Sequence, residues 1–108
     1  MRLRHILAVS GMLLALTTLG AAAQSDPAQG QALAREWCAR CHDVEKDGPF
    51  KQHPPSFTSI SIFRSENQIY GRILFPPLHS AMPEMIYILN QDNMKDILAY
   101  ILSLEPND

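Results

Sequence analysis

Two cysteines three positions apart, with a histidine directly after the second, dominate the chemistry of this 108-residue chain as Cys38-Ala39-Arg40-Cys41-His42. On a helical turn, side chains at positions i and i+3 project from the same side. The two sulfurs can therefore bond to one flat ligand, and the histidine that follows lies beneath that ligand. The remaining segments have to pack around this short motif.

Four kinds of site use such residues. Cys-x-x-Cys-His is the attachment signature of c-type haem, in which the cysteines form thioether bonds and the histidine offers one ring nitrogen to the iron while the other donates to a carbonyl. A thioredoxin-like dithiol calls for a βαβ context, a structural zinc needs a fourth ligand, and a disulfide leaves the histidine unexplained. The sequence therefore predicts one covalent haem c, bound by Cys38, Cys41 and His42.

The start of the chain has the pattern of a targeting segment. Positive residues at 2, 4 and 5 precede an apolar stretch over 6–19, and small residues occupy 21–23. The apolar stretch is shorter than the ~18 residues of a membrane span, is interrupted by polar residues and has no positive charge after it. We therefore predict a signal peptide over 1–23 that is cleaved near Ala23, before Gln24, and a periplasmic domain over 24–108 with no stable membrane insertion.

The predicted domain is lean in apolar residues. After Ala23, 35 of 85 residues are apolar. A domain of this size buries only ~60 to 65% of the surface that its unfolded chain exposes. We therefore expect haem to supply apolar area that the side chains lack, and the haem-free chain to be largely unfolded.

The charge distribution argues against nucleic acid as a partner. Residues 24–108 hold 7 Lys and Arg against 11 Asp and Glu, a net charge of −4, and the basic residues are dispersed. Binding to phosphates needs a stripe of positive charge, so nucleic acid is not an expected partner. The expected partners are other periplasmic redox proteins, and the protein is expected to be a monomer.

Start and stop signals predict helices. Three segments follow capping residues and carry apolar residues at helical spacing, and residues 56–63 hold a short helical turn. The capped segments are Pro27 to about Ala39 after Asp26, Glu66 to Phe75 after Ser65, and a last helix after Asn90 that ends near Glu105. Residues 43–55 form a loop broken by glycine and proline. No alternating strand pattern of useful length occurs, so the predicted fold class is all-α.

A second iron ligand has to come from elsewhere in the chain. Met82 is the candidate that we favour, because Pro83 biases it away from helical backbone and Ser80 and Ala81 are small enough for close approach to a flat ring. His79 is the rival, because imidazole binds iron at least as readily, and an open position is a third alternative. The remaining candidates are interpreted as core packing or as solvent-facing: Met85, Met94 and His53.

From about Asp26 to Leu104 the chain resembles a class I monohaem cytochrome c, a small fold of three to four helices around one haem. In that family the first helix crosses the last at small residues. The resemblance implies that Gly30 and Ala34 occupy this crossing, opposite Ile97 and Tyr100.

The resemblance also extends to two loops. Pro54-Pro55-Ser56-Phe57 is similar to the family's Gly-Pro-x-Leu stretch, with Pro54 in place of glycine, and implies that the Pro55 carbonyl accepts the proton of His42. Met82-Pro83 is similar to the family's axial methionine loop. Apolar packing around the haem is expected from Phe57, Ile60, Ile69, Ile73 and Leu74.

These expectations describe a one-electron carrier rather than an enzyme. Protein ligands on both sides of the iron leave no site for substrate, and thioether sulfur is a soft donor that favours ferrous iron and raises the reduction potential. Two alternatives stay open: a haem sensor or gas-binding protein with a labile sixth ligand, and the electron-transfer subunit of one periplasmic dehydrogenase. Redox partners dock around an exposed haem edge, for which the candidates are Ala39, Arg40, Phe75, Leu78 and Ala81.

Overall fold

The structure, a computed structural model, describes residues 24–50, 53–78 and 80–106. Within them the elements are α1 (Pro27–Trp37), α2 (Phe57–Phe63), α3 (Glu66–Leu74), the 3-10 turn η1 (Met85–Tyr87) and α4 (Gln91–Ser103). These residues contain no β-strand, so the predicted all-α class is confirmed. None of the described helices is long and apolar enough to cross a bilayer. The predicted signal peptide, residues 1–23, lies outside the described residues.

The predicted helix starts are confirmed by their caps. The Asp26 carboxylate accepts from two backbone N–H groups in the first turn of α1. Ser65 and Gln68 cap each other reciprocally at the start of α3, and the Asn90 side chain accepts from the Asn93 N–H at 2.8 Å. Each cap satisfies N–H groups that have no partner within the helix, which fixes where the helix begins.

α1 ends two residues earlier than predicted, at Trp37 rather than Ala39. The Cys38 N–H still donates to the Ala34 carbonyl at 2.9 Å, but the Ala39 N–H donates to that same carbonyl at 3.0 Å. The backbone thus leaves the regular helix as the cysteine motif begins.

The other two helix ends lie close to their predicted positions. α3 ends at Leu74, one residue earlier than predicted, because Phe75 precedes Pro76 and a residue before proline is biased away from helical backbone. α4 ends at Ser103, two residues before the predicted limit at Glu105.

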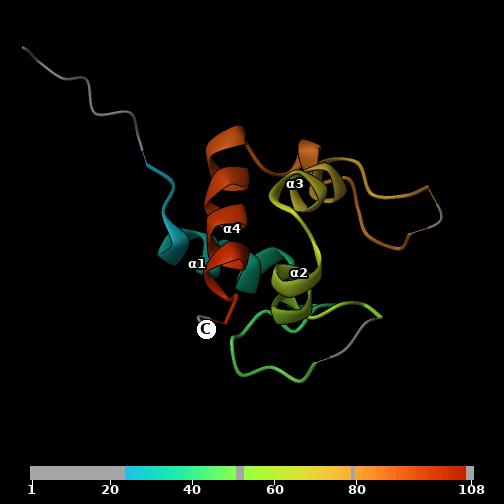
Figure 1. Ribbon diagram of the computed structural model, residues 1–108. Coiled ribbons are helices and arrows are strands. Elements are labelled where there is room, and N and C mark those ends of the chain that lie inside the picture. The colour runs from blue at the N-terminus through green and yellow to red at the C-terminus, as the bar shows by residue number, and fades with distance from the viewer. Residues whose placement is uncertain (1–23, 51–52, 79, 107–108) are drawn as a thin grey trace, which may run out of the picture.

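The fold is organised around a close crossing of α1 and α4, with α2 and α3 beside α4 (Figure 1). A Cβ added to Gly30 would lie 1.9 Å from the Asp96 carbonyl oxygen and 2.9 Å from the Ile97 nitrogen. Ala34, one turn further along α1, is fully buried. The Asp26 N–H also donates to the Asp96 carboxylate at 2.7 Å. The crossing that the resemblance implies is therefore present, and it requires glycine at position 30.

Every helix contributes apolar side chains to the core. The outer faces of α2 and α3 do not take part. The largest share comes from α4, whose predicted apolar stripe is buried. Trp37 shares the helical spacing of Gly30 and Ala34 but is 43% exposed, because it lies one turn beyond the crossing. The buried apolar residues are Leu33, Ala34, Val44, Phe57, Ile69, Ile73, Met85, Leu89, Met94, Ile97, Leu98, Tyr100, Ile101 and Leu104.

The crossing predicts that two glycines respond oppositely to alanine. Gly30→Ala should lower the free energy of unfolding of the haem-loaded protein by about 3 kcal/mol or more, because the new methyl group overlaps α4 backbone that cannot move aside. Gly71→Ala, in open space on α3, should raise it by up to about 1 kcal/mol through helix propensity. Chemical denaturation of both variants measures the difference, and equal changes would contradict the proposed crossing geometry.

Candidate functional site

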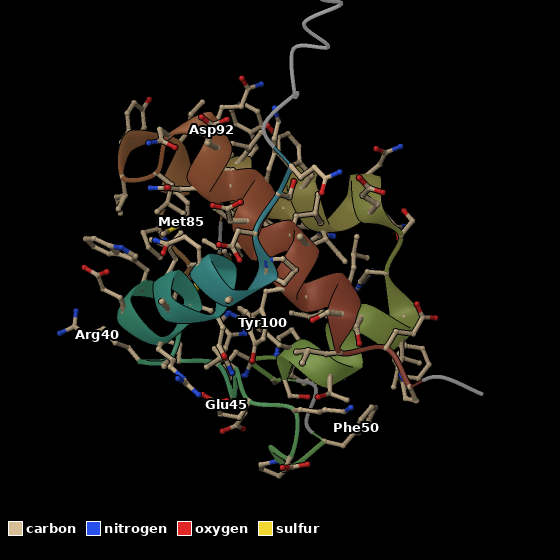
Figure 2. All side chains as sticks on the ribbon, turned by 90° about the vertical axis from the view of Figure 1, so that its left-hand side faces the viewer. Arg40, Glu45, Phe50, Met85, Asp92 and Tyr100 are labelled. Atoms are coloured by element: carbon tan, nitrogen blue, oxygen red, sulfur yellow. The ribbon has the colours of Figure 1, made fainter. Side chains whose placement is uncertain are left out.

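The cysteine motif forms a tight turn at the end of α1. The Cys41 N–H donates to the Cys38 carbonyl at 3.1 Å, and the His42 N–H donates to the same carbonyl at 2.9 Å. These bonds are those of one helical turn, so the expected geometry is kept although α1 itself has ended. Within this turn Arg40 is exposed, and its side chain points away from the helices (Figure 2).

The ring of His42 is held by the loop that precedes α2. Its Nδ1 lies 2.6 Å from the Pro55 carbonyl oxygen. A carbonyl only accepts, so Nδ1 carries the proton and donates, and the lone pair of a neutral ring then lies on Nε2. The Phe57 ring lies beside the imidazole, with 5.7 Å between ring centroids. The ring is therefore oriented and fixed in the tautomer that a metal ligand needs.

Two further bonds hold this loop in place. The Phe57 N–H donates to the Asp43 carbonyl at 2.9 Å, which ties the residue after His42 to the segment that carries Pro55. Ser56 is fully buried and caps α2, with its hydroxyl accepting from the Ser59 N–H at 3.2 Å. These roles of Asp43 and Ser56 were not predicted from the sequence, although a serine before an apolar run is itself a capping signal.

The two cysteines differ in their surroundings. They are not joined by a disulfide. Cys38 is half-buried and packs against the core, and burial raises the pKa of its thiol to about 11. Cys41 is exposed. Cys38 thus lies against the core and Cys41 at the surface, so a group bonded to both would have one covered edge and one accessible edge.

The candidates for the second iron ligand differ in how deeply they are buried. Met82 is half-buried at the margin of the core, and its N–H donates to the Ser80 hydroxyl at 3.1 Å. Met85 and Met94 are 3% and 1% exposed, so their interpretation as packing is confirmed. His53 is exposed, as expected, and His79 lies outside the described residues. In the part of the chain that the structure describes, no three Cys, His, Asp or Glu side chains gather as a metal site would require.

Comparisons with known proteins agree with this arrangement. The family model described as "Cytochrome c" matches residues 27–105. Cytochrome c-552 from Bradyrhizobium diazoefficiens is 32% identical over 106 residues, covering 94% of this chain and 97% of the relative. Cytochrome c2 from Pararhodospirillum photometricum is 29% identical over 77 residues, covering 71% of this chain and 63% of the relative. No solved structure matches the chain significantly.

The chain belongs to the cytochrome c family. Its cofactor is a covalently bound haem c, and it is a monohaem electron carrier that works with redox partners. The side chains present suit this group, because the turn supplies two thiols at the required spacing and an imidazole whose Nε2 is left available by the Pro55 contact. When bound, haem c supplies an iron that gains and loses one electron.

The residues predicted to pack around the haem are buried or half-buried, and those predicted to dock redox partners are exposed. Phe57, Ile69 and Ile73 are buried, and Ile60 and Leu74 are half-buried against the core. All five docking candidates are exposed: Ala39, Arg40, Phe75, Leu78 and Ala81.

Proposed function

We propose that this cytochrome is a periplasmic one-electron shuttle in which Cys38 and Cys41 bind the haem and His42 and Met82 bind its iron. The observation that carries the proposal is the 2.6 Å contact between His42 Nδ1 and the Pro55 carbonyl oxygen. This hydrogen bond directs the free ring nitrogen away from the loop and increases the basicity of the imidazole as a ligand.

Met82 is the methionine best suited to the second position. Met85 and Met94 are sequestered in the core, whereas Met82 lies at its margin on a segment without regular secondary structure. A thioether in this place could reach an iron without disrupting the packing of the core. Ligation by the His42 nitrogen and the Met82 sulfur would leave the iron no position for substrate, which favours electron transfer over substrate chemistry.

The proposed location follows from the leading segment. A positive start, a short apolar stretch and small residues before Gln24 are typical of an exported precursor. Export also brings the two cysteines into an oxidising compartment. The proposed partners are other proteins of that compartment that donate or accept single electrons.

Covalent attachment is tested by removing the sulfurs. Cys38→Ser and Cys41→Ser should each leave at most one thioether bond, and the double variant should leave none. Haem staining after denaturing electrophoresis reports the covalent link independently of activity. Retention of covalent haem by the double variant would exclude these two cysteines as the attachment site.

The identity of the second ligand is tested by two loop variants and a core control. Met82→Ala should abolish the far-red sulfur-to-iron band of the oxidised protein and lower the reduction potential by more than about 30 mV, where ~59 mV is tenfold for one electron. His79→Ala, and Met85→Leu in the core, should leave both unchanged. If His79→Ala alters the band and the potential while Met82→Ala leaves them unchanged, the protein is a bis-histidine cytochrome. A high-spin spectrum of the wild-type protein would favour the sensor alternative.

Electron exchange should depend only weakly on salt. Residues 24–108 carry a net charge of −4, and their basic residues are dispersed rather than grouped at one edge. Stopped-flow rate constants with anionic hexacyanoferrate and with cationic tris(phenanthroline)cobalt should change in opposite directions with added salt, each by less than about tenfold. A steep loss of rate with the anionic reagent would reveal a concentrated positive edge and contradict the expectation.

A further inference from the structure

The orientation of the His42 ring depends on two segments that are distant in the sequence. One is the turn that carries the histidine itself, and the other is the loop that carries Pro55, whose carbonyl oxygen lies 2.6 Å from Nδ1. Any relaxation of residues 42–45 relative to residues 55–57 changes the length and angle of this hydrogen bond. The strength of the bond therefore depends on what holds these segments together.

Tyr100 of α4 contacts both segments. Its hydroxyl donates to the Val44 carbonyl at 2.6 Å, and its ring centroid lies 6.3 Å from that of Phe57. The backbone bond from the Phe57 N–H to the Asp43 carbonyl joins the same two segments. In Figure 2, Tyr100 lies between α4 and the segment that carries Glu45. One side chain of the last helix thus braces the turn and the loop against each other.

The surroundings of the Tyr100 hydroxyl keep it protonated, so that it can donate a hydrogen bond. The side chain is 5% exposed, and burial raises its pKa above the ordinary tyrosine value, so the hydroxyl keeps its proton at physiological pH. On its outer side the Gln31 amide lies 3.5 Å from the hydroxyl and 3.1 Å from the Glu45 carboxylate, which Arg35 also pairs. This polar cluster covers the hydroxyl on the solvent side of the Val44 contact.

We propose that Tyr100 is a positioning residue for the iron-binding histidine and that it sets the reduction potential through Val44 and the His42–Pro55 hydrogen bond. The inference rests on the proposed ligation by His42. A strong hydrogen bond from Nδ1–H makes the imidazole a more basic ligand, and a more basic ligand stabilises ferric iron. Loss of the hydroxyl leaves the Val44 carbonyl without its buried donor, loosens the turn, weakens the Nδ1–H bond and so raises the potential.

The decisive variant is Tyr100→Phe, with Tyr87→Phe as the matched control because Tyr87 is 85% exposed. In Tyr100→Phe the equilibrium should shift toward the reduced form by about twofold to tenfold, which equals a rise of ~18 to 59 mV for one electron. The resonance of the His42 Nδ1 proton should also move, and that proton should exchange faster with solvent. Tyr87→Phe should change neither the potential nor the ring proton.

A second control separates positioning from stability. Leu104→Ala removes a buried side chain at the end of the same helix and should lower the melting temperature without moving the potential. If Tyr100→Phe lowers the melting temperature but leaves the potential and the ring-proton exchange unchanged, Tyr100 serves stability alone and the inference is wrong.

The inference stays testable if Tyr100→Phe fails to assemble. Val44→Ala removes the buried side chain that seats the accepting carbonyl, and it should raise the potential in the same direction. An unchanged potential in this variant would overturn the inference. Failure of the underlying ligation would be visible separately, in the spectrum of the wild-type protein before any variant is compared.

Discussion

The contact of α1 with α4 at Gly30 is the constraint on which the rest of this cytochrome depends. At that point the two helices approach until a single methyl group would overlap the carbonyl of Asp96. Such an approach fixes both the separation and the register of the helices, because neither can slide without backbone contact. The end of α1 carries the cysteine turn and α4 carries Tyr100, so their relative position is set by the crossing.

From this crossing, a short series of hydrogen bonds reaches the histidine. Tyr100 on α4 holds Val44, the backbone at Asp43 holds Phe57, and the neighbouring Pro55 carbonyl receives the proton of His42. Each of these partners is buried or half-buried, so water competes weakly and each bond retains more of its strength. A small helical domain without a large core thereby gains a rigid imidazole.

Features that depend on local chemistry were predictable from the sequence. The caps at Asp26, Ser65 and Asn90 lie where the side chains can reach the first free N–H groups, so the helix starts were correct. The apolar period of α4 likewise identified its buried face. The end of α1 was predicted two residues too late. It depends on the Ala34 carbonyl, which accepts from both the Cys38 and the Ala39 N–H, and residue types do not indicate such a shared acceptor.

Long-range contacts were harder to derive from residue patterns. The Pro55 carbonyl was expected only through the family resemblance, because residue types alone do not single out one loop carbonyl as the partner of a histidine 13 residues away. The bond from Tyr100 to Val44 spans 56 residues and was not predicted at all. A tyrosine in an amphipathic helix shows that a hydroxyl needs a partner, but the identity of that partner depends on the completed packing.

The two proposed ligands are held in physically different ways. His42 is fixed by bonds that originate in a turn, a loop and the last helix, and breaking its position requires several of them to open together. The segment that carries Met82 has local bonds within itself, from the Ser80 N–H to the Pro77 carbonyl at 2.8 Å and from the Met82 N–H to the Ser80 hydroxyl at 3.1 Å. Segments held by few, exposed and local bonds open at lower free energy than those tied into the core. If Met82 is the ligand, exchange of iron ligands should therefore begin on the methionine side, while the histidine side keeps its geometry.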